Sequence, residues 1–324
     1  MPRVSIGMPV YNGERFIEET VHSLLLQTYG DFELIISDNG STDGTRSLCE
    51  SFASRDPRIR YYREEENRGA AWNYNRVVEL ASGEYFKWAA HDDLCAPEYL
   101  ERCVRVLDEH PGVVLAYPDD MDIDDEGKRI DRKRQSHVPS ADRAASPRPS
   151  ERFRNLVRLD YDCEQVFGLI RRDLLVRSLL IGSYTDSDRT LLAELGLYGT
   201  FREVPEPLFL HRHHDSSSCR ANPIEEGWHQ RASWFDPDLK GQVLYSQWRQ
   251  LREYVKAVLR SPIGIVEKGR CFFWLGVRYR NRLPDLIREI RVGWSQKPRV
   301  PGSGNPKAVP THSASRERTM EEVS

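Results

Sequence analysis

The sequence lacks long apolar segments and paired cysteines. Its longest apolar run, residues 271–277, is far shorter than the roughly 20 residues that cross a bilayer, so we expect no transmembrane helix. The first residues enter a strand-like pattern without the apolar centre of a secretory signal, and the cytoplasm is the expected compartment. Six cysteines are scattered without a Cys-x-x-Cys pair, which argues against a zinc site and a disulfide framework.

Two glycine motifs of nucleotide-binding proteins are also absent. No Gly-x-Gly-x-x-Gly follows the first predicted strand, and no Gly-x-x-x-x-Gly-Lys-Ser/Thr occurs anywhere in the chain. The first absence disfavours a dinucleotide-binding protein, and the second disfavours a P-loop enzyme. A nucleotide would have to be bound in another way.

Charge is distributed unevenly, although the net charge is only -3. Residues 240–299 contain 14 Lys or Arg and four acidic residues, an excess of +10, whereas residues 1–239 carry -13. The near-neutral total excludes a generally basic nucleic-acid-binding protein, so we expect no nucleic-acid partner. The uneven distribution predicts that the acidic and the basic parts are different structural units.

Apolar runs alternate with helical patterns over the first 117 residues. Strands are predicted at 4–10, 32–37, 59–62, 84–89 and 113–117, and helices at 14–27, 42–53, 70–81 and 97–109. This alternation is typical of a parallel sheet with helices on both faces. The pattern then weakens, with a loop at 119–134, a mobile stretch at 136–150, extended segments at 165–171 and 204–211, and helices at 151–159, 188–195, 243–260 and 264–292.

Polar clusters follow three of the predicted strands. They are Tyr11-Asn12-Gly13, the segment 38–41, and His91-Asp92-Asp93. Ligands of such sheets bind outside the carboxyl ends of the strands. Strand-end loops are commonly polar in any protein, but three clusters at one edge favour a binding site.

The adjacent carboxylates of Asp92 and Asp93 repel one another unless a cation or hydrogen-bond donors neutralise them. Mg²⁺ and Mn²⁺ favour carboxylate oxygens and commonly keep phosphate oxygens as further ligands, so a nucleoside diphosphate fits this chemistry. Alternatively, one aspartate caps the helix that begins near Pro97.

Five segments occur in the order and spacing of a known family. They are Met8-Pro9-Val10-Tyr11-Asn12, the segment 36–45, Glu66-Asn67-Arg68-Gly69, the segment 81–85, and His91-Asp92-Asp93 with Pro97. Together they resemble glycosyltransferase family 2 over about residues 3–215. The resemblance implies a GT-A type fold, with a doubly wound mixed sheet and helices on both faces, and nucleotide-sugar donors.

The resemblance assigns a donor pocket at the first two strand ends. Pro9, Val10 and Tyr11 would line the nucleoside pocket, with Asp38 and Asn39 at the base. Many members have a second aspartate where this chain has asparagine. Because an amide offers both an acceptor and donors, it could still accept from a uracil or thymine N3–H or could favour another base.

The resemblance also implies a site for Mg²⁺ or Mn²⁺. The family motif often reads Asp-x-Asp-Asp, of which this chain keeps the last two acids. Asp93 is assigned to the metal and Asp92 to the ribose or a metal-bound water, with Arg68 in the same donor site.

Arg212 and His214 match the family's Arg-x-His, whose His can complete the metal or phosphate site. Three His and one Arg in residues 211–214 favour an anion-facing loop; the alternative is a solvated loop.

A sugar transfer needs a base that takes the proton from the acceptor hydroxyl. The resemblance places this carboxylate near the start of a helix in the second half of the domain, which matches residues 184–195. Asp188 is the first choice and Asp186 the second. Alternatively, either acid is a helix cap or a first-turn acid that interacts with the helix dipole.

The sequence therefore predicts a metal-dependent, inverting glycosyltransferase with a GT-A domain over 1–239, a basic helical extension over 240–294 and a disordered tail over 295–324. It would move a sugar from a nucleoside-diphosphate sugar to a hydroxyl of a saccharide or lipid-linked acceptor, in polysaccharide, glycolipid or glycoconjugate synthesis. A nucleotidyltransferase is the alternative enzyme, but a Gly-rich basic loop would be expected after its first strand. A non-catalytic nucleotide-binding scaffold would be expected to have lost the acidic pair or the base.

The basic region 240–299 carries aromatic residues among its cations, as interfacial helices do. Peripheral contact with the anionic inner surface of a membrane is one hypothesis. The other is that the aromatic residues pack onto the domain and the cations balance its negative charge.

Overall fold

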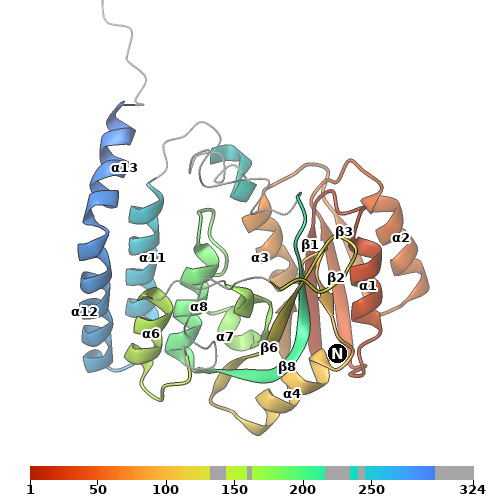
Figure 1. Cartoon of the computed structure of the whole chain (residues 1–324), viewed down its shortest axis with the longest axis horizontal. Coiled ribbons are helices and arrows are strands. Elements are labelled where there is room, and N and C mark those ends of the chain that lie inside the picture. Colours follow the sequence, from red (N-terminus) through yellow and green to blue (C-terminus); the bar gives the residue numbers. More distant parts are fainter. Residues whose placement is uncertain (132–143, 159–162, 216–233, 240–244, 296–324) are drawn as a thin grey trace, which may run out of the picture.

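The computed structural model describes residues 1–131, 144–158, 163–215, 234–239 and 245–295. This part of the chain contains an eight-stranded sheet in the order β3-β2-β1-β4-β7-β6-β8-β5. Helices cover both faces of the sheet (Figure 1).

The first half of the sheet is parallel and follows the predicted alternation. The strands are β1 (Val4–Val10), β2 (Phe32–Asp38), β3 (Ile59–Arg63) and β4 (Tyr85–Trp88), and the helices between them are α1 (Ile17–Leu25), α2 (Thr45–Arg55) and α3 (Ala70–Leu80). Every residue of β1 and β2 is buried. Their apolar runs therefore form strands covered on both faces, as the sequence predicts.

The second half makes the sheet mixed. The remaining strands are β5 (Leu94–Cys95), β6 (Val113–Ile123), β7 (Leu169–Arg171) and β8 (Thr200–Arg212), with α4 (Tyr99–Glu109) between β5 and β6. β7 is antiparallel to both β4 and β6, and β5 is antiparallel to β8, whereas β6 and β8 are parallel. This mixed sheet with helices on both faces confirms the GT-A type architecture.

Two predictions of local structure around the sheet were wrong, and a third was wrong outside it, because the helix expected over 264–292 is divided at Arg282 into two helices. The loop expected from residue 119 begins later, because β6 continues to Ile123 by pairing with β8. Aspartates are depleted in strands, but long-range pairing overrides that preference here. The strand expected from residue 165 begins with a 3-10 helix, η1 (Glu164–Phe167), before β7. Of the stretch predicted to be mobile, residues 136–143 lie outside the described residues.

Two apolar cores lie on opposite faces of the sheet. One packs α1, α2 and α4 against the sheet through residues such as Ile17, Phe52 and Leu100. The other packs α3, α6 (Pro149–Arg158) and α8 (Ser187–Tyr198), with Phe153 and Leu191 fully buried. Both faces are therefore closed, and the strand ends remain for ligands.

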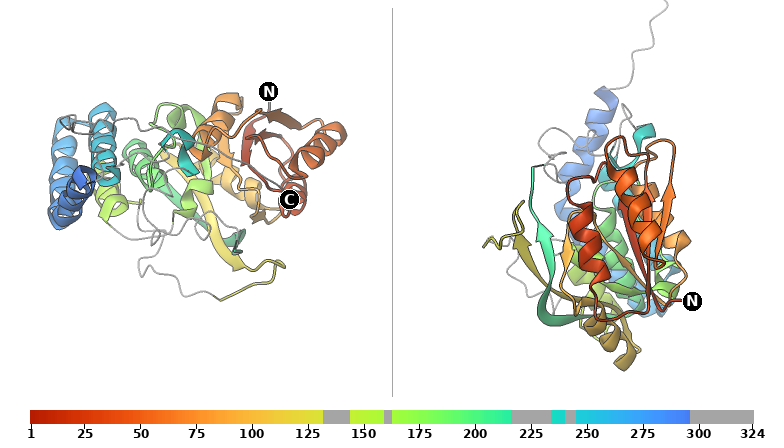
Figure 2. Two further views of the ribbon diagram at one scale, coloured as in Figure 1. Left: turned by 90° about the horizontal axis from the view of Figure 1, so that it is seen from above. Right: turned by 90° about the vertical axis from the view of Figure 1, so that its right-hand side faces the viewer.

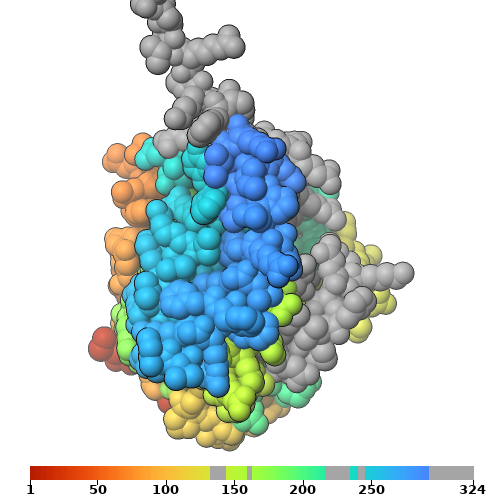
Figure 3. Space-filling view, turned by 90° about the vertical axis from the view of Figure 1, so that its left-hand side faces the viewer, coloured from red at the N-terminus to blue at the C-terminus, as the bar shows by residue number. Residues whose placement is uncertain are grey.

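The second core continues into the C-terminal helices, α11 (Ser246–Arg260), α12 (Ile265–Asn281) and α13 (Leu283–Ser295). They share one side of the molecule in Figure 3. The predicted helical extension is confirmed, and the domain division at residue 239 stays a prediction. Of the tail predicted over 295–324, Ser295 is the last residue of α13, and residues 296–324 lie outside the described residues. Within those residues, no helix has the length and apolar character needed to cross a bilayer.

Candidate functional site

Asp38 stands at the carboxyl end of β2 and is fully buried. One carboxylate oxygen accepts the Ser41 backbone N–H at 2.8 Å, and the other accepts the Tyr61 hydroxyl at 2.8 Å. Arg63 Nε lies 3.5 Å from the second oxygen. Protein groups therefore neutralise this carboxylate and fix the loop that follows β2.

Asn39 uses its whole amide to hold the loop that contains Arg68. Its Nδ2 donates to Asn67 Oδ1 at 2.9 Å and to the Gly69 carbonyl at 3.1 Å, while its Oδ1 accepts the Arg68 N–H at 3.0 Å. The Arg68 guanidinium lies over the Trp72 ring, 4.4 Å from its centroid. The structure therefore brings Asn39 and Arg68 together. A carboxylate at position 39 would not make the two donated bonds.

The first strand end meets the same region. Pro9 and Val10 are buried, and the Val10 carbonyl accepts the Asn39 backbone N–H at 2.9 Å. Tyr11 is 42% exposed, at the turn where Asn12 has a positive φ of 53°. Of the three residues assigned to the nucleoside pocket, Tyr11 is therefore the one that presents its side chain to solvent.

The acidic pair lies beside the end of β8, as the resemblance implies. Asp92 Oδ2 is 2.9 Å from His214 Nε2, and Asp93 Oδ1 accepts the Arg212 backbone N–H at 2.9 Å. Asp93 and His214 are both buried. His214 Nδ1 is buried without a hydrogen-bond partner in the described part of the chain.

The two adjacent carboxylates have opposite pKa shifts. Burial, reinforced by the charge of Asp92, raises the pKa of Asp93 to about 6. Burial acts in the same direction on Asp92, but the imidazoles of His91 and His214 outweigh it and lower its pKa to about 2. Burial disfavours the ionised form of Asp93, and a bound cation would offset that cost, so these carboxylates fit a hard divalent cation.

Arg212 is buried, with 1% of its side chain exposed. Its Nε donates to the Asp92 carbonyl at 2.9 Å, one terminal nitrogen donates to the Asp125 carbonyl at 2.8 Å, and the other pairs with Glu19 Oε2 at 2.6 Å. The guanidinium therefore joins α1, the acidic pair and the turn after β6. The interpretation of residues 211–214 as an anion-facing loop is wrong for this residue.

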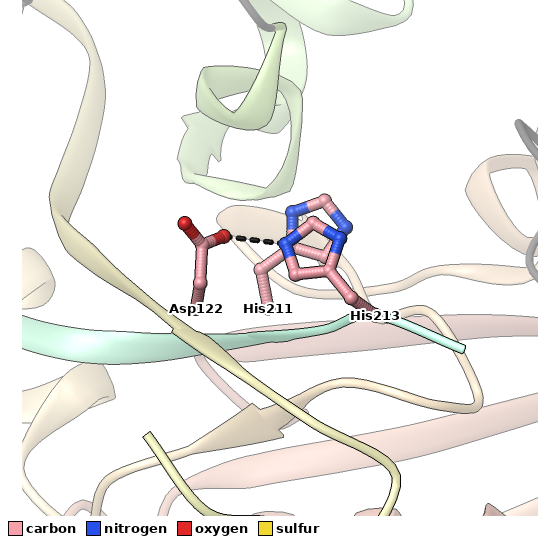
Figure 4. Close-up of side chains that lie close together, drawn as sticks. All are labelled: Asp122, His211 and His213. Atoms are coloured by element: carbon pink, nitrogen blue, oxygen red, sulfur yellow. Dashed lines mark hydrogen bonds and ion pairs between the residues drawn. The ribbon is translucent and has the colours of Figure 1, made fainter. Parts of the chain in front are cut away.

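Of the other two histidines of this segment, His213 contacts an aspartate that sequence reasoning missed, and His211 stacks on His213. His213 Nε2 lies 2.5 Å from Asp122 Oδ1, and the His211 and His213 rings stack with centroids 4.6 Å apart (Figure 4). The missed signal is the alternation of Asp120 and Asp122 with apolar residues, which is typical of a strand.

Both candidate bases lie at the start of α8. Asp186 is the N-cap residue, with a left-handed φ of 63°, and its side chain makes no capping hydrogen bond. Asp188 lies in the first turn, where its Oδ1 accepts the Arg189 N–H at 2.7 Å. The capping explanation is therefore unsupported for Asp186, whereas the first-turn explanation fits Asp188.

Cys163 and Glu164, at the start of η1, interact with these two acids and with a histidine, respectively. Burial, with the charges of Asp188 and Asp186, raises the pKa of the Cys163 thiol. The next residue, Glu164, has Oε1 at 3.8 Å from His211 Nδ1. The start of α8 and the end of β8 therefore approach the same short segment.

An eight-stranded mixed sheet with an acidic pair at its strand ends defines a protein of the GT-A class. The sequence model named Glycosyl transferase family 2 matches residues 5–178, more than half of the chain. The chain belongs to this family.

Two curated relatives match a third of the chain. One is the "Putative teichuronic acid biosynthesis glycosyltransferase TuaG" of Bacillus subtilis, 40% identical over 108 residues, which are 33% of this chain and 43% of that protein. Another is an uncharacterized glycosyltransferase of Rickettsia typhi, 38% identical over 108 residues, which are 33% of each chain. The matched region spans less than half of either relative.

A solved structure shows the same fold. It is that of Staphylococcus aureus TarS 1–349 in complex with UDP-GlcNAc, with a TM-score of 0.59 and 16% identity over 91% of this chain and 82% of that chain. At this identity the likeness establishes the architecture alone.

Proposed function

We propose that this protein is an inverting glycosyltransferase that moves a sugar from a nucleoside-diphosphate sugar to an acceptor hydroxyl. The observation that carries the proposal is the Asp92–Asp93 pair, held at the strand ends beside His214 in a family 2 chain. TarS, which shares the fold, was solved with UDP-GlcNAc, and the name of TuaG refers to teichuronic acid biosynthesis. We therefore propose a saccharide or lipid-linked acceptor in polysaccharide or glycoconjugate synthesis.

Asp93 and His214 are the proposed ligands of Mg²⁺ or Mn²⁺. The raised pKa of Asp93 and the unpartnered Nδ1 of His214 support this assignment, because a cation would satisfy both groups. When bound, the cation would offset the charge on the leaving diphosphate. Asp92, whose lowered pKa keeps it ionised, would contact the ribose or a metal-bound water.

The donor base would lie at the ends of β1 and β2. Tyr11 offers an exposed ring there, and the buried Pro9 and Val10 would form the floor. Asp38 and Asn39 would shape the base pocket through the loops that they hold, because their own polar atoms are bonded by the protein. Arg68, half-exposed over Trp72, lies on the loop that Asn39 holds.

The base of the reaction would be Asp186 or Asp188. The chosen carboxylate takes the proton from the acceptor hydroxyl while the oxygen attacks the anomeric carbon and the bond to the diphosphate oxygen breaks. One carboxylate is enough for such a direct displacement with inversion. The absence of a side-chain capping bond favours Asp186, since its carboxylate is not used to start the helix.

The experiment that tests this function combines Asp93→Asn with a donor-binding assay. We expect nucleoside diphosphates to raise the Tm of the full chain more in Mn²⁺ than in chelator, and this Mn²⁺-dependent part to be lost in Asp93→Asn. Turnover should fall about a thousandfold, because the loss of the metal would remove about 4 kcal/mol of transition-state stabilisation.

Asp173→Asn is the matched control, since Asp173 is an exposed aspartate in α7 (Arg172–Leu175), directly after β7. It should bind and turn over as the native chain does. Full turnover by Asp93→Asn in chelator would contradict the metal site. A folded native chain that binds no nucleoside diphosphate would contradict the function itself.

A further inference from the structure

A cluster of two histidines and one aspartate is built on the paired ends of β6 and β8. Asp122 is the direct register partner of His211, and His213 lies two residues further along. Residues two apart on an extended chain share a face, so the three side chains project to the same side of the sheet. The His213 N–H donates to the Ile123 carbonyl at 2.8 Å, which fixes the backbone up to that residue.

The side chains are close enough to share one ion. One ligand atom from each residue can be chosen so that all three lie within 4.8 Å of one another. Three atoms that bind one ion at about 2.1 Å in a tetrahedral arrangement lie about 3.4 Å apart. Binding would therefore require side-chain rotations that bring the three atoms more than about 1 Å closer together. Figure 4 shows both rings on the side of Asp122.

A neighbouring carboxylate creates an environment that favours a cation at this cluster. Glu164 Oε1 lies 3.8 Å from Nδ1 of His211, so its negative charge is next to the cluster on the Nδ1 side of the ring. The negative charge of Glu164 would stabilise a cation held by the cluster. All three side chains of the cluster are partly exposed, so further coordination positions can face solvent.

We propose that Asp122, His211 and His213 bind a divalent transition-metal ion of the Zn²⁺ or Co²⁺ type, at a site distinct from the proposed Mg²⁺ or Mn²⁺ site at Asp93. Two imidazoles and a carboxylate form a donor set suited to these ions, whereas Mg²⁺ prefers an all-oxygen shell. The proposal does not depend on the glycosyltransferase function. The competing explanation is that the contact between His213 and Asp122 only joins β6 to β8.

The test is a Co²⁺ titration of the full chain, read by visible absorption and by calorimetry, with Zn²⁺ as competitor. We expect a Co²⁺ absorption band that disappears when Zn²⁺ is added. His211→Gln, His213→Gln and Asp122→Asn should each weaken this binding at least tenfold, while His110→Gln, which changes a histidine outside the cluster, should not. Melting curves identify any variant that fails to fold, and His211→Gln leaves the Asp122–His213 contact in place.

Asp93→Asn separates this site from the donor site. It should keep the Co²⁺ band, with affinity changed by no more than a few-fold. The proposal is overturned if the native chain binds no Co²⁺, if the cluster variants bind it unchanged, or if Asp93→Asn removes the band.

Discussion

Charged side chains are used in opposite ways at the two ends of this molecule. At the strand ends, Arg212 is 1% exposed and each arm of its guanidinium is bonded. On α13, Arg288 is 73% exposed in a simple pair with Asp285. Figure 2, seen from above, places the C-terminal helices at the opposite end of the molecule from α1 and α2.

The difference shows where single substitutions should matter. A buried charge has lost its hydration and depends on each protein partner, so removing one member leaves the others unsatisfied. An exposed ion pair contributes little, because water and salt already screen both charges. Single substitutions at the strand ends should therefore have measurable effects. On the helical face, only several substitutions made together should have a comparable effect.

The largest expected effect on stability comes from Arg212→Ala. It removes the donor from the carbonyls of Asp92 and Asp125 and the partner of Glu19, so we expect the free energy of unfolding to fall by about 3 kcal/mol. Arg288→Ala, also an arginine paired with an acid, should cost less than about 1 kcal/mol. Urea denaturation of both variants measures the contrast. Equal losses of unfolding free energy in the two variants would show that burial does not make Arg212 more important for stability than Arg288.

The next effect concerns the two acids at the start of α8. Asp186→Asn should lower the turnover rate by about a hundredfold, the usual scale for a lost general base, and leave nucleoside-diphosphate binding unchanged. Asp188→Asn should act mainly on helix stability, because its carboxylate bonds the adjacent N–H. Steady-state kinetics of both variants decides between them. The reverse result would identify Asp188 as the general base. If both variants keep the native turnover rate, neither aspartate is the general base.

The first half of the fold could be predicted because its signals are local. Apolar runs such as 4–10 and 32–37 are buried on both faces and end at turn residues. The end of β6 could not, since its aspartates form a strand only by pairing with residues about 90 positions later. The acidic pair and His214 could be predicted as site residues because they belong to a motif. The burial of Arg212 could not be predicted, because it depends on Glu19, a partner that no local pattern indicates.

The exposed helical face divides the two hypotheses for the basic region. Tyr254 and Tyr279 are buried in the shared core, as expected if aromatic residues pack onto the domain. However, Val266 and Phe273 are 65% and 63% exposed on α12, and Ile287 is exposed on α13. Val266, Arg270 and Phe273 have the spacing of one helix face, where apolar and cationic residues alternate as in interfacial helices. We therefore keep the proposal that this face contacts an anionic membrane surface.

The smallest expected effect of a single change is on this membrane contact, because each cation near an anionic leaflet contributes only about 1 kcal/mol. Removing the whole basic region after residue 239 would not test this contact cleanly, because it would expose the core that includes Tyr254 and Leu275. Phe273→Ser with Ile287→Ser keeps that core. At low salt we expect the native chain to sediment with anionic vesicles, the double variant to do so several-fold less, and Leu26→Ser, an exposed leucine beside α1, to match the native chain. If the native chain stays in the supernatant, the face does not bind membranes, and its cations only balance the acidic domain.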